Sequence, residues 1–231
     1  MSLTETLLRP LLSGAAAGRP LITWYDDATG ARVELSAVTL ANWAAKTANW
    51  LVDEHDVEPG TQVAVTLPAH WQTAGVLLGA WWAGAHVVSE VDGAAVAFVT
   101  PGEIVSGADV TAVVSLDPMG RDLGGSVDGG IDFVAEARVH GDDFLALQPV
   151  PGSTPALASS TVDEVLVAAR TQAIEPGARV LSTMDWTIPD GVLTAVVSVL
   201  AAKASLVQVS NPDPAKLDNH RTTERTTVNL E

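Results

Sequence analysis

The chain has 231 residues, 47% of them hydrophobic, so it is long enough to bury a core and too apolar to be disordered over most of its length. Its 28 acidic residues outnumber 12 basic ones, and the formal net charge of −16 disfavours binding to nucleic acids and anionic membranes. Cysteine is absent, which excludes disulfides, thiolate nucleophiles and cysteine-ligated zinc. The N-terminal residues lack the basic region and apolar core of a secretory signal, so we expect a cytoplasmic protein.

The N-terminal part of the chain predicts a helix, a hairpin and a second helix. Residues 3–12 form a short amphipathic pattern that ends at the small-residue linker 13–18. Residues 20–35 alternate between apolar and polar on either side of an Asp-Asp-Ala-Thr-Gly turn, which is typical of a β-hairpin. Ser36 or Thr39 then caps a helix whose apolar residues recur every 3.6 positions.

An uncharged stretch follows, around which the rest of the chain is organised. No Asp, Glu, Lys or Arg occurs between Glu58 and Glu90, so most of this stretch must lie away from water. An apolar run over 63–67 predicts a buried strand, the spacing over 71–82 predicts a helix, and a second apolar run over 85–88 predicts another strand. This order is typical of a parallel βαβ unit.

The alternative interpretation of this stretch is a transmembrane helix. Its uncharged part, 73–88, is shorter than the roughly 20 apolar residues that cross a bilayer, and it contains glycines and ends in a strand-like run. We therefore predict a buried helix and no membrane contact.

The pattern of strand, helix and strand returns near the C-terminus. Residues 174–181 read Ile-Glu-Pro-Gly-Ala-Arg-Val-Leu, which matches the Val-Glu-Pro-Gly-Thr-Gln-Val-Ala of residues 57–64. An uncharged helical pattern over 191–202 and an apolar run over 205–209 complete the second copy. The capping-box sequence Thr-Val-Asp-Glu at 161–164 begins the helix that precedes it.

The fold predicted from this repeat is α/β, with a doubly wound, mostly parallel sheet built from two similar α-β-α-β halves. The halves span about 18–92 and 160–210, and residues 93–159 join them within a single domain, 1–210. The strand order of the joining segment stays open. Residues 211–231 are polar, and we expect them to form a loosely held tail.

Several of these segments resemble the N-terminal domain of the adenylate-forming (AMP-binding) superfamily, which comprises acyl-CoA synthetases, adenylation domains and luciferases. The resembling segments of the first half are Pro20–Trp24, Leu40–Leu51, Val57–Pro68 and Ala83–Val88. In the second half, Arg179–Thr183 and Gly191–Val209 resemble the strand, helix and strand that follow the family's phosphate loop. The resemblance implies this family's fold more strongly than its activity. Short, lysine-poor chains of this kind also resemble an uncharacterised actinobacterial group.

The position of the family's phosphate loop departs from the family pattern. The resemblance implies a Ser/Thr/Gly-rich loop ending in Pro-Lys-Gly, whose backbone N–H groups and lysine hold the phosphates of ATP. Here Gly152, Ser153 and Thr154 are the only remnant, prolines remove N–H donors, and no lysine occurs between Lys46 and Lys203. We interpret this segment as an ordinary connection and not as a phosphate cradle.

Two further departures concern the acyl pocket and the catalytic lysine of the family. The resemblance implies a histidine or an aromatic residue three positions before Gly191, where this sequence has Ile188. The chain also ends before the segments that would correspond to adenine recognition, the ribose-binding aspartate and the small C-terminal domain with its catalytic lysine. We therefore assign no catalytic residue and no cofactor, and the interpretation leans away from an enzyme.

Tryptophan and histidine supply the remaining candidates for a site. Six of the seven tryptophans lie at positions 24, 43, 50, 71, 81 and 82. We favour packing of the tryptophan pairs 43/50 and 81/82 between the second helix and the central helix over a stacking platform for a ligand. The histidines lack metal-ligand spacing, so no metal site is predicted. His70 stays a ligand candidate because it follows a strand, although a helix-start histidine bonded to the backbone is the alternative.

Two functions remain open. The first is a non-catalytic remnant of an AMP-binding domain that acts as an interaction or structural protein, with a second copy or another protein covering its apolar surface. The alternative is a binder of a small molecule, such as a nucleotide, CoA or an acyl group, or an atypical enzyme that uses the residual crevice. The candidate ligand-binding residues are His70, Trp71, Gly152, Ser153, Thr154, Trp186, Ile188 and Gly191.

Overall fold

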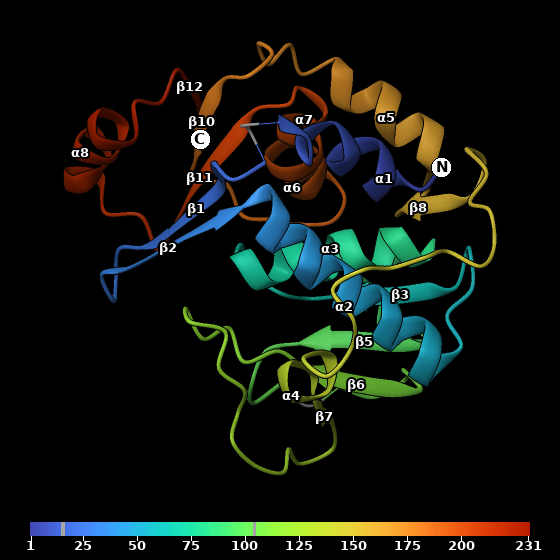
Figure 1. Cartoon of the computed structure of the whole chain (residues 1–231). Helices are drawn as coiled ribbons and strands as arrows, with labels where there is room; N and C mark the ends of the chain where they lie inside the picture. Colours follow the sequence, from blue (N-terminus) through green and yellow to red (C-terminus); the bar gives the residue numbers. More distant parts are fainter. Residues whose placement is uncertain (15–16, 104) are drawn as a thin grey trace.

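The computed structural model describes residues 1–14, 17–103 and 105–231, and it contains two sheets (Figure 1). The five-stranded sheet has the order β12-β10-β11-β1-β2, and the seven-stranded sheet has the order β7-β6-β5-β3-β4-β8-β9. Neighbouring strands pair in parallel except β1 with β2 and β8 with β9. The strands are β1 Pro20–Asp26, β2 Ala31–Ser36, β3 Gln62–Val65, β4 His86–Val88, β5 Val96–Val99, β6 Val110–Val113, β7 Ile131–Asp132, β8 Pro155–Leu157, β9 Ser160–Thr161, β10 Arg179–Ser182, β11 Ser205–Ser210 and β12 Val228–Leu230. The α/β class with mostly parallel strands is confirmed.

The helices begin where the sequence supplies caps. At the start of α2, Ser36 Oγ accepts a hydrogen bond from Thr39 N (3.1 Å), and Thr161 and Glu164 form the predicted capping box of α5. The helices are α1 Leu3–Leu8 with a 3-10 turn Arg9–Leu11, α2 Ala37–His55, α3 Trp71–Ala83, α4 Phe133–Ala137, α5 Val162–Arg170, a continuous segment of α6 Asp190–Val192, a π-helical turn Leu193–Val197 and α7 Ser198–Ala201, and α8 Pro214–Glu224. In the parts of the chain that the structure describes, no helix is both long and apolar enough to cross a membrane. The predicted linker 13–18 lies partly outside the described residues.

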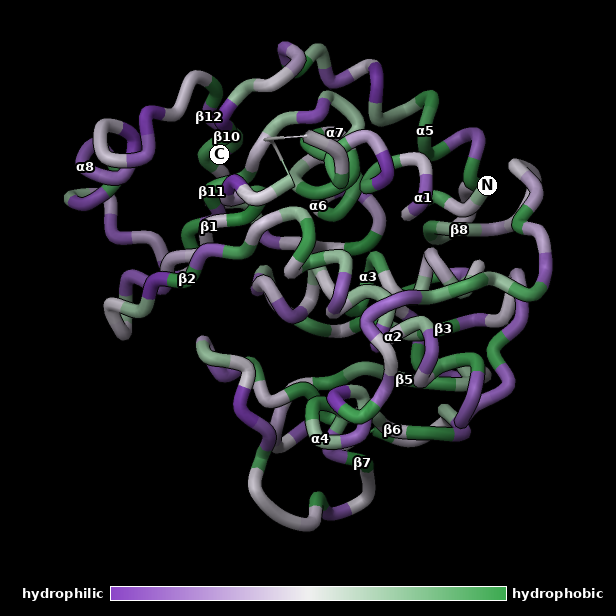
Figure 2. The backbone as a smooth tube through the Cα atoms, viewed as in Figure 1, coloured by the Kyte–Doolittle hydropathy of each residue, from purple (hydrophilic) through white to green (hydrophobic). Residues whose placement is uncertain are grey.

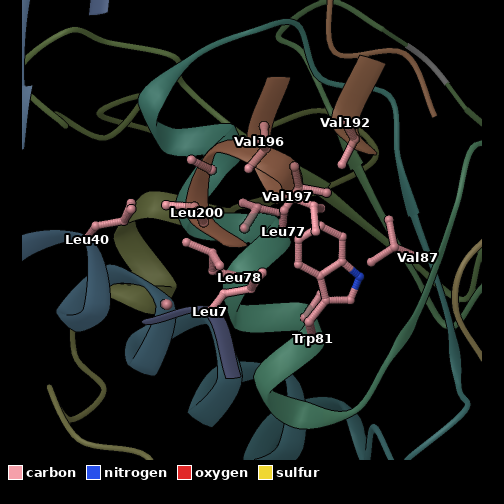
Figure 3. Close-up of a cluster of buried hydrophobic side chains, with 14 of the residues drawn as sticks. Leu7, Leu40, Leu77, Leu78, Trp81, Val87, Val192, Val196, Val197 and Leu200 are labelled. Carbon is pink, nitrogen blue, oxygen red and sulfur yellow. The ribbon is translucent and has the colours of Figure 1, made fainter. Parts of the chain in front are cut away.

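The two copies of the sequence repeat lie in different sheets. The first copy, β3-α3-β4, belongs to the seven-stranded sheet, and the second, β10 to β11 with the helical segment 190–201, belongs to the five-stranded sheet. Contrary to the expectation of one doubly wound sheet, the strands form two sheets. The two central helices are apolar all round, and such helices are stable only when other elements cover every side of them. Figure 3 shows side chains of the two central helices in one buried cluster: Leu77, Leu78, Trp81, Val192, Val196, Val197 and Leu200.

Glycines let α2 and α3 approach closely. A Cβ atom at Gly79 would lie 2.7 Å from Ala44 O and 2.7 Å from Thr47 Cγ2, whereas a Cβ atom at Gly75 would lie 3.3 Å from Trp43 Cβ. Distances under 3 Å are much shorter than van der Waals contact. The spacing of the two helices therefore depends on the missing side chain at position 79.

Contrary to the prediction, the tryptophans of α2 do not pack on Trp81 and Trp82. Trp43 meets Trp71, at the start of α3, with ring centroids 5.5 Å apart, and Trp50 packs on phenylalanines of β5 and α4. Trp81 and Trp82 contact other elements. The packing of α2 on α3 is confirmed, but small residues occupy the closest part of the contact, so the rings lie beyond it.

The residues after 210 are not a loose tail. β12 pairs in parallel with β10, and α8 lies beside the five-stranded sheet (Figure 1). Glu224, at the end of α8, is buried and accepts hydrogen bonds from Tyr25 Oη (2.6 Å), Arg32 Nη2 (2.8 Å) and Arg179. Figure 2 shows that α8 is largely hydrophilic. The polar composition that suggested a loosely held tail therefore attaches α8 to the sheet through charged hydrogen bonds instead of apolar contacts.

Candidate functional site

Two adjoining hollows lie where strands of both sheets end. The smaller, of about 250 Å³, lies at the carboxyl ends of β1, β3, β10 and β11, and the larger, of about 620 Å³, lies at those of β3 and β5. They share Pro68 and Asp185, so we treat them as one sheet-end crevice. In parallel α/β folds this edge is where ligands bind. The crevice is lined by residues 24, 26, 65–70, 89, 100, 103, 116, 183, 185–188 and 208–212.

His70 lines the smaller hollow and begins α3. It is only 2% exposed, and its Nδ1 accepts a hydrogen bond from Gln72 N (3.1 Å), which makes it the N-cap of the helix. Burial lowers the pKa of His70 to about 3, so the ring is neutral at neutral pH. Because Nδ1 is an acceptor, the proton of the neutral ring is on Nε2. This Nε2 is buried and has no hydrogen-bond partner among the described residues.

The wall beside His70 is held by a set of paired donors. Trp24 Nε1 donates to Ala69 O (3.0 Å) and to Ser210 Oγ (2.9 Å), and Ser210 Oγ donates to Ala69 O (2.7 Å). The rings of Trp24 and His70 meet edge-on, with centroids 4.4 Å apart. These contacts tie β1 and β11 of one sheet to the turn after β3 of the other.

The turn before the 190–201 helix forms another wall. Trp186 is buried and donates from Nε1 to Gln208 Oε1 (3.0 Å), and both Trp186 and Ile188 line the larger hollow. Gly191 does not line either hollow. A Cβ atom at Gly191 would overlap with Asp185 O, so this glycine allows the backbone to fold back on itself.

The other predicted site residues lie away from the crevice. Trp71 lines neither hollow, and its Nε1 donates to Pro118 O (3.1 Å). Gly152, Ser153 and Thr154 precede β8, which runs parallel to β4. They therefore lie at the amino edge of the seven-stranded sheet, opposite the crevice. The expectation that this segment joins the crevice is wrong, because β8 enters the sheet from the amino edge.

A carboxylate fills the space beside this remnant of the phosphate loop. A Cβ atom at Gly152 would overlap with the Asp163 carboxylate, and Gly152 O accepts a hydrogen bond from Asp163 N (2.9 Å). The N–H of Thr154 is bonded to Pro151 O (3.0 Å). A negative charge at this point repels phosphate, so the residues present do not fit the triphosphate of ATP.

The crevice itself is acidic. Asp26, Glu103 and Asp185 line it, and none of its lining residues is Lys or Arg. Burial raises the pKa of Asp26, but hydrogen bonds from Asn211 and Thr29 outweigh this effect and lower the pKa. The crevice therefore favours uncharged or cationic molecules over anions.

Gln208 and Ser210 are among the crevice residues that the sequence analysis did not single out, and Trp24 appeared there only as one of six tryptophans. Each lies near the end of a strand that the hydrophobic pattern does predict. The signal that could have found them is the rule that ligands bind at carboxyl ends, applied to every predicted strand. The parallel pairing of β1 with β11 brings them together from opposite ends of the chain.

This arrangement is the fold of the N-terminal domain of adenylate-forming enzymes. Acyl-CoA synthetase from Brucella canis matches with a TM-score of 0.80 and 16% identity over 99% of this chain and 47% of that chain. A benzoate CoA ligase from Burkholderia xenovorans LB400 matches with a TM-score of 0.74 and 15% identity over 99% of this chain and 50% of that chain. The N-terminal domain of FACL13 from Mycobacterium tuberculosis matches with a TM-score of 0.66 and 14% identity over 99% of this chain and 62% of that chain. The chain thus spans about half the length of the synthetases it matches, and the likeness shows the fold alone.

A protein of similar length has a related sequence over almost its whole length. It is a TIGR03089 family protein from Mycobacterium tuberculosis (strain ATCC 25618 / H37Rv), 45% identical over 239 residues that cover 98% of this chain and 97% of the relative. The chain belongs to the TIGR03089 family. No protein-family model matches it. The expected resemblance to adenylate-forming enzymes and to an actinobacterial group is confirmed.

Proposed function

We propose that this protein is a non-catalytic member of the adenylate-forming fold, which acts by binding another molecule and not by activating an acyl group with ATP. The observation that supports this most directly is the Asp163 carboxylate packed against Gly152, in the segment where the resemblance implies a phosphate loop. A cytoplasmic location is part of the same proposal.

ATP is expected to leave the thermal stability of the protein unchanged. A ligand that binds only the folded state raises its stability with the logarithm of free ligand over Kd, so a thermal-shift screen with ATP, AMP, CoA and acyl-CoAs detects even weak binding. Each compound is measured with and without magnesium. A magnesium-dependent rise of several degrees with ATP would contradict the proposal and redirect attention to the 152–154 segment.

We further propose that the binding partner is a second copy of the chain. The segment that runs along α2 after α4 exposes three large apolar side chains, Val139 (83%), Leu145 (82%) and Leu147 (86%). Exposed apolar groups gathered in one segment are typical of a protein–protein contact. A two-fold contact that buries the same segment in both copies is the simplest closed assembly.

Sedimentation measurements test this dimer. The wild-type chain is expected to sediment as a dimer, and the double substitution Leu145→Ser with Leu147→Ser is expected to shift it to a monomer. Val167→Ser is the matched control, since Val167 is also exposed (62%) but lies on α5. A wild type that stays monomeric at every concentration, or a control that dissociates as readily, rules out this face.

A second candidate function is the binding of a small molecule in the sheet-end crevice. The observation that favours it is the pair of adjoining hollows at the carboxyl ends of the strands, where ligands bind in parallel α/β folds. The two candidates involve different faces, so each is tested separately.

A further inference from the structure

A separate hollow of about 250 Å³ lies at the end of the five-stranded sheet that is opposite the crevice, where β1, β11 and α2 begin. We call it the amino-edge hollow. Four buried apolar residues, Leu11, Leu21, Ala37 and Ala204, form part of its wall. The hollow therefore offers an apolar surface to any molecule that enters it.

The charged residues of the amino-edge hollow are basic. Arg19 and Lys203 line it and are exposed, and none of its described lining residues is Asp or Glu, although the chain has 28 acidic residues and only 12 basic ones. The sheet-end crevice has the reverse composition, with three carboxylates and no Lys or Arg among its described lining residues. The two ends of β1 and β11 therefore favour ligands of opposite charge.

Arg19 and Lys203 also differ from most basic residues of this chain in their partners. Within the described residues, ion pairs with carboxylates involve seven of the twelve basic side chains: Arg32, Lys46, Arg121, Arg138, Arg179, Lys216 and Arg221. Arg19 and Lys203 are not among these seven. Two cations at one hollow, without a carboxylate in a chain rich in carboxylates, point to an anion supplied from outside the chain.

The start of α2 adds to the positive potential of the hollow. α2 has 19 residues, its first residue lines the hollow, and its first turn contains no acidic residue. The N-terminal end of a helix carries a partial positive charge. The N–H groups of residues 38 and 39 are already bonded to oxygens of the chain, so the helix contributes its dipole, and Arg19 and Lys203 supply the hydrogen-bond donors.

We propose that the amino-edge hollow binds a small organic anion, whose charged group pairs with Arg19 and Lys203 and whose apolar body lies against the apolar wall. The apolar wall favours such a molecule over an inorganic ion, because apolar surface leaves water when it binds. The volume is below the roughly 300–1,000 Å³ of pockets for drug-sized ligands, so it suits a single ring better than a nucleotide. This site is separate from the sheet-end crevice and from the face of the proposed dimer.

Three probes separate the contributions of charge and apolar contact: benzoate has both a ring and a negative charge, benzyl alcohol has the ring alone, and acetate has the charge alone. Binding is followed by NMR of the backbone amides of Gly177 and Ala204, which line the hollow. Benzoate is expected to shift these signals to saturation, and benzyl alcohol and acetate are expected to bind more weakly. Sodium chloride is expected to weaken the binding of benzoate, because salt screens exposed charges.

A substitution then tests the role of the basic side chains. Lys203→Gln removes one charge, and the affinity for benzoate is expected to fall about threefold to fivefold, the upper range for an exposed charge pair. Arg225→Gln is the matched control, since Arg225 is also exposed and has the same left-handed backbone angle (φ 53°) but lines neither this hollow nor the crevice. Arg225→Gln is expected to bind benzoate like the wild type. Unfolding curves show that both variants are folded.

Three results would overturn the inference: no saturable response to benzoate, equal binding of benzoate and benzyl alcohol, or the same affinity for benzoate in Lys203→Gln and Arg225→Gln. None of them bears on the proposed lack of ATP activation. A magnesium-dependent stabilisation by ATP that persists in Lys203→Gln would contradict that proposal and leave this one intact. The two proposals are therefore decided by separate measurements.

Discussion

Replacing Gly79 with alanine is expected to lower the free energy of unfolding by about 3 kcal/mol. Alanine is the better helix former by about 1 kcal/mol, so helix propensity alone predicts the opposite sign. The added methyl group would lie 2.7 Å from both Ala44 O and Thr47 Cγ2, and one of these atoms belongs to the backbone. The two helices must separate to relieve the overlap, which opens gaps in the surrounding core.

Comparing the urea unfolding of Gly79→Ala with that of Gly75→Ala isolates this effect. Gly75 lies one turn earlier on the same face of α3, and a Cβ atom there meets only Trp43 Cβ at 3.3 Å. Gly75→Ala is expected to change stability by less than about 1 kcal/mol, because the gain in propensity offsets a single tight contact. Equal effects of the two substitutions would show that helix spacing is not set at position 79.

Replacing Glu224 with glutamine is expected to lower the free energy of unfolding by about 1.5–3 kcal/mol, the range for hydrogen bonds to charged groups. Glutamine keeps the shape of the side chain but removes the charge that faces Arg32 and Arg179. Its amide group also leaves one of the three donors without an acceptor. The free energy of unfolding at neutral pH measures this loss.

The same substitution has a predictable pH dependence. Burial raises the pKa of Glu224, but the hydrogen bonds from Tyr25, Arg179 and Arg32 outweigh it and lower the pKa from 4.5 to about 2. A carboxylate with a lowered pKa stabilises the folded state above its unfolded pKa, and this contribution is lost as the pH falls toward the folded pKa. The advantage of the wild type over Glu224→Gln is therefore expected to be constant above about pH 4.5 and to shrink between about pH 4.5 and 2.

An exposed ion pair on the same helix provides the control. Asp218 pairs with Arg221, but its side chain is 95% exposed. Asp218→Asn is expected to change stability by less than about 0.5 kcal/mol. A similar loss in both variants would mean that the charge of α8 matters, and not the buried position of Glu224.

Local patterns predicted the elements of this fold well. The uncharged stretch around α3 and its repeat at 191–202 marked the two buried helices, and the capping residues Ser36 and Thr161 marked the starts of α2 and α5. The division into two sheets could not be predicted, because no periodicity shows that β1 pairs with β11 and not with β3. The prediction of a loosely held tail missed α8 for a related reason: the side chains that hold this helix, Arg32 and Arg179, lie far away in the sequence.

The candidate site was predicted only in part. His70 followed from its place after β3, and Ile188 from the family resemblance, as the residue three positions before Gly191. The contact of the His70 ring with Trp24, and the end of β11 beside them, come from the assembled sheets and from no local pattern. The segment 152–154 was misplaced because a resemblance in residue types does not fix which end of a strand they occupy.

The position of β1 also governs when the protein can fold. Residues 62–161 contain every strand of the seven-stranded sheet, so this sheet can form while the rest of the chain is still being synthesised. β1 is synthesised before the seven-stranded sheet, whereas its partner β11 is synthesised after that sheet. Until β11 is synthesised, the hairpin of β1 and β2 has an unpaired edge along β1, and other nascent chains can pair with such an edge. The five-stranded sheet therefore closes last, and the interval before it closes is the stage at which this chain is most exposed to aggregation.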